Sequence, residues 1–594
     1  MDLYGFYTGQ IFDAHIYLGA HFSEDMTKCY FRTYAPHAHH VDLLIHDISI
    51  TMTPTLDGKF YETILEDVKP GDKYEYRIHN HFGGYVDHCD PYGFGMELRP
   101  DHKSIVRDMN YKFSDSAWMQ TRSNMMDKPL NIYECHAGSW RKPEDNPDSW
   151  YSYTELAELL IPYLKEKGYN YVEFMPLCEY PCDNSWGYQN TGYFAPTSRY
   201  GDATELKKAI DLYHKNEIGV LLDFVPAHFA IDDYGLRRYD SDALFEYPYY
   251  DIEISEWGSC NFMHSRGEVR SFLQSSANYW LQEFHFDGIR MDAVSRLIYW
   301  QGDEKRGVNK GAVDFIKGLN HGLKHLNPGI MMIAEDSTNY PKVTAPVEYG
   351  GLGFDYKWDL GWMHDTLDFF QATPNERVDR YNKLTFSMMY FYNEKYLLPL
   401  SHDEVVHGKA TILQRMCGLY EGKFPQARTL YMYMMMHPGK KLLFMGSEFG
   451  QLREWDEEKE QDWLLLKYPN HDSFLVYMKE LNNMYQNYDA FWKMDYENNG
   501  FMWLDCNGHS KCLLSIVRNG HSSRIMSAFN FKEYEQKGYR FQADGARRIK
   551  LILHSDWERF GGTVKEEEQI FEEKNGFFTI DLPSYSSVLL EVID

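Results

Sequence analysis

The feature that most constrains this chain is a strand-then-helix alternation that repeats from about residue 131 to about residue 445. Eight short, mostly apolar runs read as strands, at residues 132–135, 169–177, 219–225, 287–294, 329–334, 354–358, 396–400 and 441–445. Strands that alternate with helices form a parallel sheet. About eight such units predict a (β/α)8 TIM barrel with insertions.

Helical spacing is clear after the first and the second expected strands. Leu156, Leu160 and Leu164 share one helix face, and so do Leu206 and Ile210. Ser152 with Glu155, and Asp202 with Glu205, have the capping-box spacing that marks a helix start just before each face. A doubly wound open sheet is the competing fold, but its GxGxxG phosphate fingerprint does not follow the first strand.

The two ends of the chain differ from the middle. Before the barrel, residues 29–34, 41–45 and 73–78 alternate as strands, and after it residues 511–518, 524–531, 548–553 and 577–592 are rich in strand formers. A polar stretch at 115–128 reads as a linker. We therefore expect a multidomain α/β protein, with an N-terminal β-sandwich at 1–115, the barrel at 116–495 and a C-terminal β-sandwich at 496–594.

Composition limits the partners. The formal charge of −28 argues against a nucleic acid partner, whose phosphates would be repelled, and is compatible with a neutral one. No apolar run is long enough to span a membrane, and the first residues do not read as a secretory signal. Nine cysteines without a CxxC pair suggest reduced thiols, so we expect a cytoplasmic protein.

Acidic and histidine residues follow several of the expected strands. The third strand leads through Asp223 to His228, the fourth carries Arg290 and Asp292, the fifth ends at Glu335, and the seventh ends at His402 and Asp403. In a barrel, the carboxyl ends of the strands meet on one face, where active sites lie. Such a carboxylate cluster serves either metal binding or glycoside chemistry, and the usual His-x-His and His-Glu-x-x-His metal spacings are absent at these strand ends.

Retaining glycosyl transfer needs two carboxyl groups, one as nucleophile and one as proton donor. Arg290 lies two residues before Asp292, so both side chains point the same way from a strand. We expect the guanidinium to favour the charged form of Asp292 and to lower its pKa. The proton donor needs the opposite shift, from an apolar setting or nearby negative charge.

These four segments resemble, in order, the four signature regions of the α-amylase superfamily of glycoside hydrolases. Further segments are similar to the 1,4-α-glucan branching enzymes within it: Ile132-Tyr133-Glu134 with His136 and Gly138-Ser139-Trp140; Ser185-Trp186-Gly187-Tyr188-Gln189; Gly350 to Trp358 with Gly361-Trp362-Met363-His364-Asp365; and Leu400 to Lys409. The resemblance runs from about Leu18 to the C-terminus.

The resemblance implies a role for each matching residue. Asp292 is the expected nucleophile, Glu335 the expected proton donor, and Asp403 the expected stabiliser of the transition state. Tyr188 is expected to stack on the glucosyl unit at the cleavage site. The residues expected to bind that unit or to orient the nucleophile are Asp223, His228, Arg290 and His402.

The resemblance also implies an N-terminal carbohydrate-binding module, an α-1,4-glucan substrate such as glycogen, cleavage with retention, and transfer to a 6-hydroxyl that makes α-1,6 branches. No cofactor and no metal are expected, nor a nucleic acid or membrane partner, and we expect a monomer or weak oligomer. One rival on the same scaffold is an α-amylase or debranching hydrolase, and a rival of another class is a catalytically inactive glucan-binding or scaffold protein. The inactive protein would have lost a catalytic carboxylate, and this chain keeps all of them.

Overall fold

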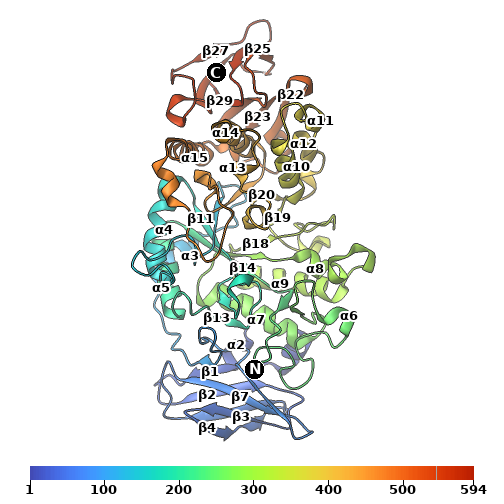
Figure 1. Cartoon of the computed structure of the whole chain (residues 1–594). Helices are drawn as coiled ribbons and strands as arrows, with labels where there is room; N and C mark the ends of the chain where they lie inside the picture. Colours follow the sequence, from blue (N-terminus) through green and yellow to red (C-terminus); the bar gives the residue numbers. More distant parts are fainter. Residues whose placement is uncertain (544, 594) are drawn as a thin grey trace.

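The computed structural model describes residues 1–543 and 545–593, and it has three parts in a row (Figure 1). A β-sandwich lies at the N-terminal end, a barrel surrounded by helices fills the middle, and a second β-sandwich forms the other end. The predicted C-terminal range 496–594 includes residues 544 and 594, which lie outside the described residues. None of the helices in the described part combines the length and apolar character that crossing a membrane requires.

The N-terminal β module consists of two antiparallel sheets that face each other across a shared core. One has the order β1-β2-β6-β5 and the other β4-β3-β7-β8, with β9 paired to β7. Alternate residues such as Phe31, Val41 and Tyr76 point into the core and are fully buried. The three strands predicted here are confirmed. The strands are β1 (Gly19–Phe22), β2 (Cys29–Tyr34), β3 (His40–Ile45), β4 (Ile48–Thr51), β5 (Thr53–Thr55), β6 (Phe60–Leu65), β7 (Lys73–His79), β8 (Tyr85–His88) and β9 (Ser104–Ile105).

Two short helices that precede this module, α1 (Leu3–Thr8) and α2 (Ala14–Tyr17), pack on helix α7 (Gly267–Glu283) of the barrel. The Ser271 hydroxyl donates to the Phe6 carbonyl at 2.9 Å, and the Ala14 amide donates to the Ser275 hydroxyl at 3.0 Å. The first residues of the chain are therefore fastened to the barrel.

The middle of the chain forms a closed parallel barrel, which confirms the predicted fold. All eight predicted strands are present in the predicted order, with ends that differ by at most three residues. Around the barrel they are β10 (Asn131–Cys135), β11 (Tyr171–Phe174), β14 (Gly219–Phe224), β17 (Gly288–Met291), β18 (Met331–Ala334), β19 (Tyr356–Trp358), β20 (Tyr396–Leu400) and β21 (Lys440–Phe444). Strand β21 pairs with β10 and closes the ring.

Helices surround the barrel (Figure 1), and the two predicted starts are confirmed. Ser152 and Glu155 form a full capping box at α4, and the Asp202 side chain accepts from the Glu205 amide at 3.0 Å at α5. The longer helices after β10 are α4 (Tyr153–Lys167), α5 (Ala203–Lys215), α7, α9 (Lys310–Leu326), α10 (Leu360–Gln371), α14 (Tyr420–Met436) and α15 (Pro469–Asn487). The shorter ones are α6 (Tyr250–Glu253), α8 (Val294–Ile298), α11 (Arg377–Arg380), α12 (Lys383–Phe386) and α13 (Ile412–Arg415).

The stretch at 115–128 that was predicted as a linker contains a short helix, α3 (Ser116–Thr121), and contacts the barrel floor. The Trp118 indole donates to Asp287, directly before β17, at 2.8 Å. Asp115 lies 2.7 Å from the His214 ring at the end of α5. The segment connects the two parts and also covers the N-terminal ends of the barrel strands.

The C-terminal β-sandwich is built from a six-stranded sheet, β22-β23-β24-β29-β26-β27, and a two-stranded sheet, β25-β28. The stretch at 577–592 that was predicted to be rich in strand formers contains two strands, β28 and β29, which a turn with Tyr585 at φ 48° separates. The strands are β22 (Phe501–Gly508), β23 (Leu513–Asn519), β24 (Arg524–Asn530), β25 (Gln536–Phe541), β26 (Arg548–His554), β27 (Ile570–Glu572), β28 (Phe578–Leu582) and β29 (Ser586–Val592).

Candidate active site

A cavity of about 490 Å³ lies at the carboxyl ends of the barrel strands. Six of the eight predicted site residues line it, namely Tyr188, His228, Asp292, Glu335, His402 and Asp403. The other two, Asp223 and Arg290, are buried and bonded to residues of this wall. The structure therefore brings together every residue that the sequence placed in the site.

The two carboxylates at the centre come from neighbouring parallel strands. Asp292 follows β17 and Glu335 follows β18, and Met291 and Ala334 are register partners just before them. The Ala293 amide donates to Glu335 Oε2 at 2.8 Å. Strand register and this backbone bond fix both side chains at one point of the rim.

Arg290 holds the carboxylates around a single positive charge. Its Nη1 lies 2.6 Å from Asp223 Oδ1 and 2.8 Å from Asp292 Oδ1, and its Nη2 lies 3.2 Å from Glu335 Oε2. The side chain is 1% exposed, and the guanidinium lies 4.5 Å from the Trp358 ring centre. Because the guanidinium is rigid and planar, its two terminal nitrogens set the positions of the Asp292 and Glu335 carboxylates relative to each other.

Burial sets the pKa values of the two central carboxyls. It raises the pKa of Asp292 to about 6, against the attraction of Arg290 and with help from the charges of Asp223 and Asp403. Arg290 acts to lower the pKa of Asp292, as expected, but the expected net lowering is wrong because burial outweighs the guanidinium. Burial and the charges of Asp292 and Asp403 raise the pKa of Glu335 to about 7, despite Arg290. Glu335 thus keeps its proton at a higher pH than Asp292, as a proton donor beside a nucleophile must.

His402 and Asp403 form the next part of the wall. His402 Nδ1 lies 2.6 Å from Glu134 Oε1, and its Nε2 lies 3.5 Å from Asp403 Oδ1. Burial alone would lower the pKa of His402, but Asp403 and Glu134 raise it to about 9. The charged His402 in turn holds the pKa of Asp403 below its usual value, although burial acts to raise it. Asp403 is 46% exposed, so it remains an anion open to the cavity.

Tyr188 forms one side of the site. Its hydroxyl donates to Asp223 Oδ2 at 2.5 Å, and its ring stacks on His402 with centroids 5.6 Å apart. Burial raises the pKa of the Tyr188 phenol well above its usual value, so the hydroxyl stays protonated. The hydroxyl bond and the contact with the His402 ring hold the Tyr188 ring in place, as a stacking platform for a sugar requires.

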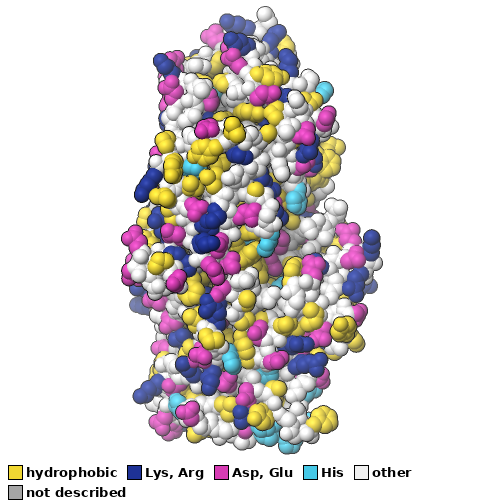
Figure 2. Space-filling model, viewed as in Figure 1, with side chains coloured by type: hydrophobic (Ala, Val, Ile, Leu, Met, Phe, Trp, Pro, Cys, Tyr) yellow, Lys and Arg dark blue, Asp and Glu magenta, His cyan; other side chains and the backbone are white. Residues whose placement is uncertain are grey.

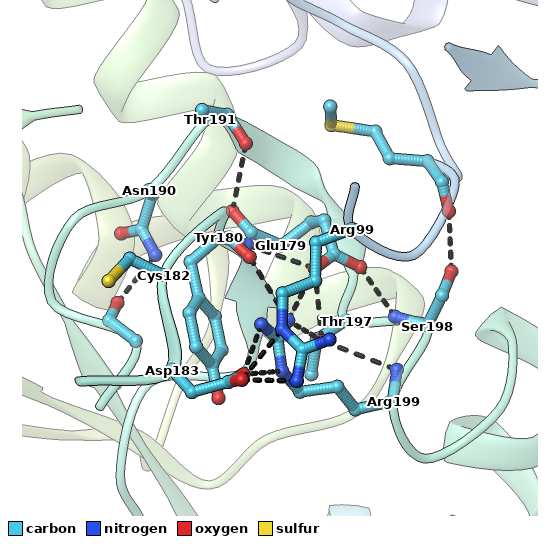
Figure 3. A network of polar contacts seen from close by, with 12 residues as sticks. Arg99, Glu179, Tyr180, Cys182, Asp183, Asn190, Thr191, Thr197, Ser198 and Arg199 are labelled. Atoms are coloured by element: carbon cyan, nitrogen blue, oxygen red, sulfur yellow. Dashed lines mark hydrogen bonds and ion pairs between the residues drawn. The ribbon is translucent and has the colours of Figure 1, made fainter. Parts of the chain in front are cut away.

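A buried network holds the loop that leads to Tyr188 (Figure 3). Arg199 lies 2.6 Å from Asp183 and 2.8 Å from Glu179, and its guanidinium lies 3.7 Å from the Tyr180 ring centre. Arg99, between β8 and β9 of the N-terminal β module, also bonds to Asp183 at 2.6 Å. The loop is thereby connected to the N-terminal β module.

His228 lies on β15 (His228–Phe229), and its ring is nearly fully buried beside Trp257. Burial lowers its pKa to about 4, so the ring is neutral at physiological pH. Within the described residues, its Nδ1 has no hydrogen-bond partner. A buried, unpaired ring nitrogen at a cavity wall is available to a ligand hydroxyl.

Sequence reasoning missed several residues of this site. Glu134 stood in a segment noted for its resemblance, but its role of holding His402 was not foreseen. Trp257, Arg296 and His407 also line the cavity, and the rings of Trp186 and His407 stack 5.3 Å apart. Trp186, Trp257 and His407 lie outside the barrel strands and Arg296 lies on the short helix α8, so strand position does not mark any of them. Aromatic residues are also too frequent in this chain, at 16%, to single out.

The cavity carboxylates do not have the spacing of metal ligands. In the described part of the chain, one group of histidine, cysteine and acidic side chains has ligand atoms close enough to hold an ion, and it lies on the N-terminal β module. In the cavity, Asp223, Asp292 and Glu335 converge on a guanidinium instead. This arrangement suits a neutral substrate and acid–base chemistry at a glycosidic bond.

A closed barrel with paired carboxylates at its rim, set between two β-sandwiches, defines an enzyme of the α-amylase class. Two family models agree: carbohydrate-binding module 48 (isoamylase N-terminal domain) matches residues 17–93, and the alpha amylase C-terminal all-beta domain matches residues 503–593. The chain is 40% identical to a 1,4-alpha-glucan branching enzyme of Geobacillus stearothermophilus, with 95% of this chain and 90% of the relative covered. It is 38% identical to the 1,4-alpha-glucan branching enzyme of Francisella tularensis subsp. novicida, with 100% of this chain and 97% of the relative covered. The chain belongs to the 1,4-alpha-glucan branching enzyme family.

Solved structures with low sequence identity share the fold. The catalytic module of the glycogen-degrading pneumococcal virulence factor SpuA is similar with a TM-score of 0.75 at 16% identity, and covers 97% of this chain and 98% of its own. A pullulanase from Anoxybacillus is similar with a TM-score of 0.75 at 17% identity, and covers 100% of this chain and 90% of its own. Proteins named as glucan-degrading and as glucan-branching thus share one architecture. The difference between the two activities must therefore lie in the active site and not in the fold.

Proposed function

We propose that this chain cleaves α-1,4-glucosidic linkages and transfers the freed chain to a 6-hydroxyl, forming the α-1,6 branches of glycogen. One observation carries the chemistry: Asp292 and Glu335, on adjacent strands, share the guanidinium of Arg290 at the wall of a cavity of about 490 Å³. Family membership supports the substrate and the outcome, since the curated relatives are 1,4-alpha-glucan branching enzymes.

In the first step, Asp292 attacks the anomeric carbon of an α-1,4-linked glucosyl unit. Glu335 gives its proton to the departing 4-oxygen, so the glycosidic bond breaks as the ester bond to Asp292 forms. The pKa values of about 7 for Glu335 and about 6 for Asp292 support these roles. At a pH between the two values, Glu335 is mostly protonated and Asp292 is mostly ionised. Asp403 remains negative and stabilises the positive charge that develops on the sugar ring.

In the second step, Glu335 acts as the base. It takes the proton of a 6-hydroxyl on an acceptor glucan, and that oxygen attacks the anomeric carbon and releases Asp292. The configuration is inverted twice and is therefore retained. Water in place of the acceptor would give hydrolysis, so the acceptor has to be positioned and solvent has to be excluded. The aromatic wall of Trp186, Tyr188 and Trp257 supplies apolar surface for both chains.

The remaining polar residues bind the glucosyl unit. The charged His402 and the neutral His228 present ring nitrogens at the cavity, and Tyr188 presents its ring. Asp223 lies beneath, bonded to Arg290 and Tyr188, and keeps both oriented. None of these steps uses a metal or a cofactor.

The experiment that tests the proposal separates branching from hydrolysis. Amylose is incubated with the protein, and iodine staining, reducing ends and the anomeric NMR signals of α-1,6 linkages are followed together. Branching lowers the stain and raises the α-1,6 signal while reducing ends stay nearly constant. A fall in stain with a matching rise in reducing ends, and no α-1,6 signal, would identify a hydrolase.

Control variants make the assay specific. Asp292→Asn and Glu335→Gln keep the size of each side chain and should abolish branching, while circular dichroism and the melting temperature show that the fold is kept. Asp314→Asn, at an exposed position of α9, should leave activity unchanged. Turnover like that of the wild type in Asp292→Asn would remove Asp292 from the mechanism.

The division of the chain supports this function. We place the domain limits at 1–115, 116–495 and 496–594, with the first as a glucan-binding module, the second as the catalytic barrel and the third as a support. The match of residues 17–93 to carbohydrate-binding module 48 supports the first assignment. Limited proteolysis with mass mapping tests the limits.

We also place the enzyme in the cytoplasm, as a monomer or weak oligomer. All nine cysteines are free thiols, which suits a reducing compartment. Fractionation of the source cells tests the compartment, and light scattering during gel filtration tests the mass against 70.2 kDa for one chain.

A further inference from the structure

Histidine side chains gather at the free end of the N-terminal β module, over β3 and its neighbours at the bottom of the view (Figure 2). The sequence provides His39 and His40 at the start of β3 and a His-x-His pair, His79 and His81, at the end of β7. Asp42 lies two residues beyond His40. This group is remote in sequence from the barrel rim, and the branching mechanism does not use it.

Strand register brings the members of the group together. Strand β3 pairs with β7 so that His40 is opposite His79. His40 and Asp42 are two residues apart on one strand, so both point to the outer face, while Val41 between them is fully buried. Because the strands are hydrogen-bonded along their length, these ligand positions are built on a rigid surface.

The side-chain distances are close to those of a zinc site. His79 Nε2 lies 3.1 Å from Asp42 Oδ2, and one ligand atom from each of His40, Asp42 and His79 lies within 4.8 Å of the others. In a tetrahedral site with bonds of about 2.0–2.1 Å, donor atoms lie about 3.3 Å apart. One pair already has that spacing, and the third donor needs a shift of about 1.5 Å or less. The His40 and His79 rings are stacked with centroids 3.9 Å apart, so side-chain rotation must also turn one ring before both nitrogens point at the same ion.

A fourth donor and a supporting shell are close by. His39 Nδ1 lies 2.9 Å from His40 Nδ1, and the rings of His39 and His81 are 5.3 Å apart. The other oxygen of Asp42 accepts from the Thr51 hydroxyl at 2.8 Å, which fixes the carboxylate as outer-shell partners do in metal sites.

The charges around the group favour a cation. Arg77 is the register partner of Asp42, but its guanidinium makes two bonds of 2.8 Å to Asp87 and lies 4.2 Å from the Tyr85 ring centre. Its charge is therefore compensated by another carboxylate. The whole chain carries a formal charge of −28, which attracts cations further.

From this geometry we propose that His40, Asp42 and His79 form a binding site for a divalent transition metal of the zinc class, with His39 or His81 as a fourth ligand. Imidazole and carboxylate donors suit Zn²⁺, Co²⁺ and Ni²⁺ and are poorly matched to Ca²⁺ or Mg²⁺, which prefer oxygen. The bound ion would join β3 to β7 at the end of the module. It has no part in the reaction at the barrel.

The test is a titration of the untagged, metal-free full chain with ZnCl₂ by calorimetry, and with CoCl₂ by visible absorption. The expected result is one tight ion per chain, tetrahedral cobalt bands, and a melting temperature that rises with Zn²⁺. Asp42→Asn and His79→Ala should each weaken binding at least tenfold and remove the cobalt bands. His40→Gln is a third variant, should either of the others fold poorly.

Two controls make the result decisive. His321→Ala removes an exposed histidine of α9 that lies 3.3 Å from Glu348, and it should bind Zn²⁺ as the wild type does. Branching activity should be the same with and without Zn²⁺, which separates this site from the proposed function. No tight Zn²⁺ binding by the wild type, or binding that survives both Asp42→Asn and His79→Ala, would overturn the proposal.

Discussion

At the scale of single residues, the site works because two carboxyl groups in one charge cluster keep different protonation states. Asp292 must be ionised to attack, and Glu335 must be protonated to donate. Both lie beside Arg290, but burial and the surrounding anions raise the pKa of Glu335 to about 7 and that of Asp292 to about 6. Environment, and not residue type alone, assigns the two roles.

A pH profile follows from these values. Activity should fall as pH drops through about 6, where Asp292 gains a proton, and should fall again as pH rises through about 7, where Glu335 loses one. Initial branching rates measured from pH 4 to 9 should give a bell-shaped curve with its maximum between the two pKa values. Because the two carboxyls interact, each apparent pKa describes the pair and not one residue alone. A rate that keeps rising above pH 8 would contradict Glu335 as the acid.

Glu134 is a positioning residue that acts through His402. The variant Glu134→Gln keeps the shape and an acceptor for the His402 amide but removes the charge that helps to raise the pKa of His402. We expect kcat to fall roughly 10- to 100-fold, because a His402 that has lost part of its positive charge attracts Asp403 less strongly and no longer orients it toward the sugar. We also expect the pKa of His402, measured by NMR, to fall. Unchanged kcat together with an unchanged His402 pKa would contradict this role.

The sequence predicted seven of the eight site residues because they stand in or soon after apolar strands, where a barrel gathers them, and it gave Tyr188 through the resemblance of its loop to a known family. It did not predict Trp257 or His407, since long loops place them and no periodicity marks them. The net direction that it predicted for the pKa of Asp292 is wrong. The sequence shows Arg290, which lowers that pKa, but the burial that outweighs Arg290 and the charges of Asp223 and Asp403 appear only in three dimensions.

At the scale of elements, a buried charge cluster joins the linker segment to the barrel floor. His214, at the end of α5, lies 2.7 Å from Asp115 and 3.1 Å from Asp287, directly before β17. Burial would lower the pKa of His214, but the charge of Asp287 and the bonds to both carboxylates raise it to about 9. The histidine is therefore a buried cation between two anions.

This cluster makes stability depend on pH in a defined direction. Because the pKa of His214 rises from 6.5 in the unfolded chain to about 9 in the fold, its contribution is complete below pH 6.5 and is lost as pH rises through 9. At about 1.4 kcal/mol per unit, the contribution is about 3 kcal/mol. Urea unfolding of His214→Asn should show lower stability at pH 6 and a flatter slope between pH 6.5 and 9 than the wild type or His321→Ala. An identical slope would contradict the assignment.

Strand positions could be predicted from sequence because fully buried parallel strands are short apolar runs. All eight barrel strands were found in this way. The short helix α3 was missed because a polar segment gives no periodicity, and its position depends on contacts such as Trp118 with Asp287. The boundary between β28 and β29 was missed because the turn at Tyr585 adopts a left-handed φ that the sequence does not mark.

At the scale of the whole molecule, one buried carboxylate joins the barrel to the C-terminal β-sandwich. Asp495 lies 3.1 Å from Lys440 on β21 and 2.7 Å from Arg518 on β23, and all three side chains are fully buried. Burial acts to raise the pKa of Asp495, but the two cations hold it below its usual value. The order of the three domains could be predicted from the sequence; this contact could not, since its partners are far apart in the chain.

Asp495→Asn should strongly destabilise the protein. The change leaves Lys440 and Arg518 buried without a counter-charge, a loss of about 3–5 kcal/mol in buried pairs. The midpoint of urea unfolding should fall accordingly, while the branching rate of the remaining folded protein at 25 °C is nearly normal, because the pair is remote from the cavity. A midpoint within error of the wild type would show that the contact is not needed.

The central claim is that Asp292 and Glu335 flank a single glucosidic linkage, and trapping the intermediate tests it most directly. Glu335→Gln is incubated with α-maltosyl fluoride, whose leaving group needs no acid, so the ester should form and then persist because the base is missing. Intact-protein mass spectrometry and peptide mapping should find one maltosyl unit on Asp292. No adduct, or an adduct on Asp223 or Asp403 instead, would contradict the account.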